Sequence, residues 1–154
     1  MPEYETKFFG RIQCASSSII EFPAGLPGFE DQRMFVLVQQ AVNRPLVFLQ
    51  SLTRPELCFI TLPARAVDAG FTVKLAEEEA RLLGLPAGTE AGAGSDTLCL
   101  GIVALAEDGS ATINLRAPLV VHCGARRAIQ VIPEESSYSH RHPLAPQPEG
   151  APCL

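Results

Sequence analysis

Basic residues are scarce in this chain. Of its 154 residues, 12 are Lys or Arg and 17 are Asp or Glu, so the formal net charge is −5. Arg126-Arg127 is the one adjacent basic pair in the sequence. Proteins that bind nucleic acid place clustered Lys and Arg side chains against phosphates. We therefore expect no direct binding to DNA or RNA.

Long apolar runs are also missing. The longest extends from Leu98 to Ala106 and contains Gly101, well short of the roughly 20 residues that span a membrane. The opening Met1-Pro2-Glu3-Tyr4-Glu5 is polar and acidic, which is not the pattern of a signal peptide. We expect a soluble, cytoplasmic protein without membrane contact.

The cysteines are dispersed and odd in number. The sequence has 5 of them and no Cys-x-x-Cys pair, whereas zinc sites usually take closely spaced ligands because one turn must present two to the same ion. Cys58 and Cys99 lie within apolar runs and are expected to be small core residues. No cofactor is expected.

Short apolar segments alternate with turn signals along most of the chain. Hydrophobic residues make up 47% of the sequence, and 13 Pro and 12 Gly interrupt them. Asp108-Gly109 is typical of a tight hairpin. The spacing predicts an antiparallel sandwich or small barrel, with strands over residues 35–38, 46–49, 57–62, 98–105, 112–116, 119–121 and 128–132.

One short helix is expected, over residues 76–83. Ala76, Ala80 and Leu83 recur at helical spacing, acidic residues come early, and Gly84 is suited to the C-terminal position. The glycine-rich segment 87–95 indicates a flexible loop. The fold class is thus mainly β: a compact, antiparallel, β-barrel-like single domain over residues 1–144 with one short helix, followed by a Pro-rich, disordered tail over 145–154.

Catalytic chemistry has weak support. His140 and His142 lie within one tripeptide and leave open a small β-barrel enzyme that binds a metal or ligand. The sequence places no third ligand beside them, and no Gly-x-Ser-x-Gly motif surrounds the serines. We expect a protein that binds rather than an enzyme.

The segment from Ile20 to Glu30 is the most distinctive in the sequence. It reads Ile-Glu-Phe-Pro-Ala-Gly-Leu-Pro-Gly-Phe-Glu, in which prolines fix φ and glycines allow tight bends. We expect a rigid double turn anchored to the core by Phe22, Leu26 and Phe29. This segment resembles the flagellar assembly factor FliW family.

Further blocks extend the resemblance over residues 6–144. Thr6–Gly10 looks like the opening strand of that family, and Leu49-Gln50-Ser51 follows in the expected order. Asn114–Val121 is similar to its Asn-Leu-x-Ala-Pro block, and Gln130–Ile132 with Tyr138–Leu144 match its closing segments.

The resemblance implies a regulatory binding protein. FliW proteins bind newly made flagellin and, once flagellin is exported, bind CsrA, the small RNA-binding repressor of flagellin translation. Opposed affinities for the two partners would couple flagellin synthesis to filament assembly. A flagellin chaperone without CsrA binding remains the alternative. We expect a monomer.

Eight residues are candidates for partner contacts under this resemblance. The segment 71–74 is Phe-Thr-Val-Lys, whereas the family tends to alternate acidic and apolar residues there, which shifts the acidic contacts elsewhere. The acidic candidates are Glu77, Glu78, Asp96 and Glu107. The polar candidates, which could instead satisfy backbone groups at strand ends, are Asn114, Gln130, Arg141 and His142.

Overall fold

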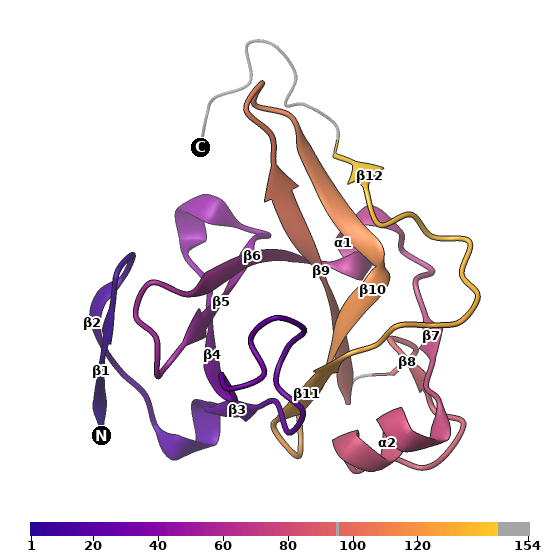
Figure 1. The fold of residues 1–154 in the computed structure, drawn as a ribbon, viewed down its shortest axis with the longest axis horizontal. Helices are drawn as coiled ribbons and strands as arrows, with labels where there is room; N and C mark the ends of the chain where they lie inside the picture. Colours follow the sequence, from indigo (N-terminus) through magenta and orange to yellow (C-terminus); the bar gives the residue numbers. More distant parts are fainter. Residues whose placement is uncertain (95, 145–154) are drawn as a thin grey trace.

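A computed structural model describes residues 1–94 and 96–144. Its central feature is a closed, 7-strand barrel (Figure 1). The barrel strands are β3 (Ile20–Glu21), β4 (Met34–Val38), β5 (Val47–Ser51), β6 (Cys58–Pro63), β9 (Thr97–Leu105), β10 (Ala111–His122) and β11 (Arg127–Gln130).

The remaining elements surround this barrel. They are β1 (Glu3–Thr6), β2 (Gly10–Gln13), the 3₁₀ helices η1 (Ser16–Ser18) and η2 (Ala41–Asn43), α1 (Ala64–Val67), β7 (Val73–Lys74), α2 (Glu77–Leu83), β8 (Glu90–Ala91) and β12 (His142–Pro143). The β1–β2 hairpin lies at one side of the barrel and α2 at the other, and the β9–β10 hairpin projects beyond it (Figure 1). Within the part of the chain described, no helix combines the length and apolarity that crossing a membrane requires.

Neighbouring barrel strands are antiparallel except where the barrel closes. There β11 pairs with β3 in parallel through Arg127 and Glu21, and the Glu21 backbone N–H donates to the Arg126 carbonyl at 2.9 Å. The mainly β, barrel-like fold expected from strand spacing is confirmed.

Three apolar clusters hold these elements together. The first contains side chains from β3, β4, β5, β9, β10 and β11, with Phe22 and Phe35 fully buried and their ring centroids 5.1 Å apart. A second joins α2 and β7 to β10 and β11 through residues such as Leu83 and Phe71. The third lies under the β1–β2 hairpin and includes Cys14, Val36 and Leu52. Of the two cysteines expected in the core, Cys99 is buried and Cys58 is half-buried.

The double turn expected after Ile20 is present. Gly25 and Gly28 adopt φ of +66° and +85°, which L side chains rarely tolerate. Leu26 is buried, and the Phe29 ring contacts Phe59 edge-on with centroids 5.6 Å apart. The turn is therefore pinned to the core by its apolar residues, as the sequence predicts.

The expected helix is confirmed as α2. Its first turn lacks a polar cap residue at Ala76, but the Glu79 carboxylate accepts a hydrogen bond from the Ala76 backbone N–H at 2.8 Å. Gly84 takes the left-handed position that ends the helix.

Three local expectations need correction. Thr6–Gly10 is not a strand: β1 ends at Thr6, β2 begins at Gly10, and the Phe9 backbone N–H donates to the Thr6 hydroxyl across the turn at 3.0 Å. The segment 87–95, expected to be a flexible loop, contributes β8, which pairs with β7 and buries Ala91. The one-turn helix α1 was not anticipated. The predicted tail, 145–154, lies outside the described residues.

Candidate protein-binding site

The four acidic candidates do not form one patch. Glu77 and Glu78 are exposed on α2, whereas Glu107 is exposed in the β9–β10 hairpin, which projects away from α2 (Figure 1). Arg81 Nε donates to Glu78 Oε2 at 2.9 Å and lowers the pKa of that carboxyl. Glu77 is exposed, and no ion pair involves it within residues 1–94 and 96–144.

Asp96 is linked to the α2 end of the barrel through His122. The Asp96 carbonyl accepts a hydrogen bond from the Cys123 backbone N–H at 2.9 Å. His122, at the end of β10, places Nδ1 2.7 Å from the Leu83 carbonyl of α2. The structure thus joins Asp96 and α2 to the same turn and leaves Glu107 remote.

Asn114 and Gln130 both serve the bulge in β10. The register between β9 and β10 shifts between Asn114 and Leu119, where Pro118 lacks a donor for the ladder. Asn114 Oδ1 accepts hydrogen bonds from the backbone N–H groups of Arg116 and Ala117 at 3.1 and 3.0 Å. Gln130 Nε2 donates to the Ala117 carbonyl at 3.1 Å. Their side chains therefore satisfy backbone groups that the bulge removes from regular pairing.

Arg141 and His142 lie on the segment that pairs with the start of β10. His142 pairs with Ile113, and the exposed Arg141 donates its backbone N–H to the Ser139 hydroxyl at 3.0 Å. Neither His142 nor the exposed His140 joins a cluster of three metal-ligating side chains within the described residues.

A half-buried hydrogen bond between two side chains, which sequence reasoning missed, positions this segment. The Tyr138 hydroxyl donates to Asp68 Oδ2 at 2.7 Å, and the Tyr138 ring packs on Phe71 with centroids 4.7 Å apart. This hydrogen bond lowers the pKa of Asp68 and raises that of Tyr138. The two residues are 70 positions apart, so no local pattern could reveal the contact.

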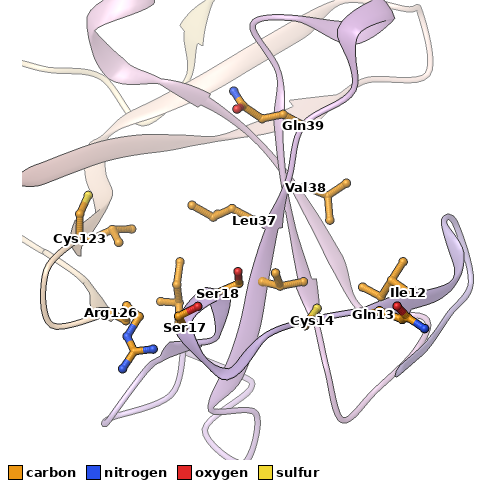
Figure 2. Close-up of a pocket in the computed structure, with 13 residues that line it drawn as sticks. Ile12, Gln13, Cys14, Ser17, Ser18, Leu37, Val38, Gln39, Cys123 and Arg126 are labelled. Carbon is orange, nitrogen blue, oxygen red and sulfur yellow. The ribbon is translucent and has the colours of Figure 1, made fainter. Parts of the chain in front are cut away.

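A large hollow lies at one edge of β4. It has a volume of about 570 Å³ and is lined by β4, β2, η1 and the turn after β10. Figure 2 shows Leu37 of β4 projecting towards Cys123, with Ser17, Ser18 and Arg126 below it. The hollow is lined by apolar side chains together with hydroxyl, amide and guanidinium groups. We name this hollow the β4 groove.

A smaller apolar surface lies at the tip of the β1–β2 hairpin. Phe8 is 59% exposed, and the Phe9 ring contacts Phe48 of β5 with centroids 5.4 Å apart. These residues line a hollow of about 260 Å³ together with Ile60. An exposed aromatic side chain beside an apolar hollow is typical of a protein-contact surface.

Comparisons with known proteins identify the family. The family model described as "FliW protein" matches residues 3–144. A protein named flagellar assembly factor FliW from Syntrophotalea carbinolica is 35% identical over 139 residues, covering 88% of this chain and 93% of that protein. The protein of that name from Bacillus subtilis is 31% identical, covering 90% of this chain and 94% of its own length.

A solved structure agrees with the sequence comparisons. The crystal structure of a flagellar assembly factor FliW matches with a TM-score of 0.80 at 26% identity, over 96% of this chain and 99% of that one. Residues 3–144, which the family model matches, contain every strand and helix described above and the double turn at Gly25–Gly28. This chain therefore belongs to the FliW family.

Proposed function

We propose that this protein is a flagellar assembly factor that binds flagellin and antagonises CsrA, and so couples flagellin synthesis to filament assembly. The observation that carries the proposal is the family match over residues 3–144, which contain the whole barrel. The relatives matched over nearly their full length are named for flagellar assembly. The protein acts in this proposal by exchanging partners, without a catalytic step or cofactor.

The charge of the chain supports the CsrA part of this proposal. A net charge of −5 favours association with a basic, RNA-binding surface, because complementary charge accelerates encounter and orients the partners. Carboxylates held near the RNA path also repel phosphate. Linkage then requires that flagellin binding lowers the affinity for CsrA by the same factor as CsrA binding lowers the affinity for flagellin.

We assign the acidic contact to the end of the barrel that carries α2 and Asp96. Glu77 and Asp96 are exposed there, and Glu78 is already neutralised by Arg81. Glu107 contributes less, because its hairpin lies away from α2. Asn114 and Gln130 are assigned to holding the bulge, which leaves Arg141 and His142 as the polar contacts on the closing segment.

The direct test is calorimetric titration of the protein with CsrA and, separately, with flagellin. Binding of both, with each partner weakening the other, is expected. Recovery of neither interaction would reject the proposal. Adding the protein to a CsrA–RNA complex distinguishes the chaperone alternative: RNA release supports CsrA antagonism, and unchanged RNA retention supports chaperoning alone.

Two double variants test the acidic contact with equal changes in charge. E77Q/D96N removes the carboxylates at the α2 end, whereas E3Q/E5Q removes two on β1 that face Arg11. Exposed charges contribute roughly 0.2–1 kcal/mol each. We expect E77Q/D96N to weaken CsrA binding about two- to tenfold at low salt and E3Q/E5Q to leave it nearly unchanged. The reverse order would place the contact on the β1 side.

A further inference from the structure

The β4 groove exists because β3 is too short to line the whole of β4. β3 pairs with β4 through Ile20 with Phe35 and Glu21 with Met34, and none of residues 1–19 pairs with β4. Upstream of Ile20 the chain turns away into η1. Beside Ile20 and Glu21, β3 occupies the space between β4 and β11. Further along β4, the corresponding space between β4 and the turn after β10 contains no strand.

The groove lies at the edge of β4 and not on either of its faces. Successive residues of a strand point to opposite faces, yet Val36, Leu37, Val38 and Gln39 all line this one hollow. Figure 2 shows Leu37 and Val38 projecting to opposite sides of β4. Side chains from both faces of β4 can reach the same hollow only if it opens along the edge of the strand.

Backbone groups of β4 are directed into the groove. The Arg33 carbonyl accepts from Phe22 on the β3 side, and the Met34 carbonyl accepts from Leu52 on the β5 side. Backbone groups alternate in direction along a strand, so the N–H and C=O of Leu37 point to the side of β3. The β-strand partner on that side ends at Ile20. Such an edge is a template for an added strand.

Arg126 gives the groove a positive charge in an otherwise acidic protein. Its Nη1 donates to the Ser16 carbonyl at 2.8 Å, and no carboxylate forms an ion pair with it among the residues described. A guanidinium carries five N–H donors in a planar fork that suits a carboxylate. Further donors of Arg126 remain for a ligand in the groove.

We propose that the β4 groove binds an extended peptide segment of a partner protein. The segment lies along β4 in line with β3, exchanges backbone hydrogen bonds with Leu37, and places a carboxylate against Arg126. Strand addition supplies affinity through the backbone, while apolar side chains of the segment reach the apolar lining of the groove. This binding mode does not depend on whether the partner is flagellin or CsrA.

The test uses the full chain and a library of random nine-residue peptides, displayed with and without one Asp or Glu. Selection should enrich peptides that alternate apolar residues and carry a carboxylate. In a selected peptide, methylation of every second backbone nitrogen in one register should abolish binding, and methylation in the other register should preserve it. Hydrogen exchange of the Leu37 amide should slow on binding.

Arg127 provides the matched control for Arg126. Both are exposed and adjacent, but Arg127 does not line the groove. R126Q should weaken binding of the selected peptide at least about tenfold, and R127Q should have no effect. R126K should restore only part of the affinity, because Lys keeps the charge but lacks the planar fork.

The proposal would be overturned by failure to select any peptide, by equal loss of affinity in R126Q and R127Q, or by an unchanged Leu37 exchange rate in the complex. Full protection of the Leu37 amide in the free protein would likewise overturn it, because the edge would already be occupied. The titrations with flagellin and CsrA are independent of these results, so either proposal can fail alone.

Discussion

The double turn at Gly25–Gly28 offers a sharp test of what the family motif does physically. Both glycines have positive φ, yet their surroundings differ. A Cβ on Gly25 would lie 2.6 Å from the Glu30 Cα and carbonyl oxygen, closer than folded proteins allow, whereas a Cβ on Gly28 would meet nothing within 4 Å. Alanine at Gly28 therefore tests only the cost of the left-handed backbone conformation, whereas alanine at Gly25 adds the cost of a steric clash.

The expected magnitudes follow from these two terms. G28A should lower the free energy of unfolding by about 1–2 kcal/mol, the cost of a left-handed conformation for a residue with Cβ. G25A should carry the same cost plus about 1–3 kcal/mol, because the obstructing atoms are backbone and must shift. The total of about 2–5 kcal/mol is a large part of the 5–15 kcal/mol available to a typical domain.

Urea unfolding followed by circular dichroism measures both variants against the parent chain. The midpoint of G25A should fall well below that of G28A, with similar slopes. Equal destabilisation, or a larger effect for G28A, would refute the argument that close backbone approach at Glu30 dictates Gly25.

Other consequences can be checked in the same protein. N114A leaves two backbone N–H groups of the β10 bulge without their acceptor and should lower the free energy of unfolding in urea by about 1–3 kcal/mol. A decrease of less than about 0.5 kcal/mol would contradict the assigned role. Burial raises the pKa of Cys99 to about 11, so iodoacetamide at pH 8 should label exposed Cys123 and spare Cys99 until unfolding, as read by peptide mass spectrometry. The hydrogen bond from Tyr138 lowers the pKa of Asp68, so its stabilisation is present above the unfolded carboxyl pKa of about 3.9 and is lost as pH falls through the lower folded value. The difference in urea midpoint between D68N and the parent should therefore be present at pH 7 and shrink towards pH 3, and a constant difference would exclude the charged hydrogen bond as its cause.

Local patterns were sufficient for the helix α2 and for the barrel strands except β3, which lies at the start of the segment expected to be a double turn. Apolar runs bounded by proline and glycine located most of the barrel strands, and the Asp108-Gly109 pair placed the β9–β10 hairpin, with Gly109 at φ +87°. One of the errors arose where a partner elsewhere along the chain decides the conformation. Ala91 is in a strand because β7 pairs with it, and nothing in the glycine-rich sequence around it indicates that pairing.

The site was harder to predict than the fold for the same reason. Asn114 and Gln130 were singled out as polar residues, but their acceptor and donor roles depend on a bulge that brings Ala117 between them. The β4 groove depends on where β3 stops, and Arg126 lies 110 positions from the Ser16 carbonyl to which it donates. A single sequence contains the residues of such a site without indicating that they are neighbours.

Closure of the barrel by its first and last strands also governs how the protein is made. A nascent chain that ends before Arg127 has β3 without the parallel neighbour that completes the ring. Unpaired strand edges are the form most prone to pair with a second chain. Translation through the final barrel strand therefore supplies the neighbour that covers the β11-facing edges of β3 and β10.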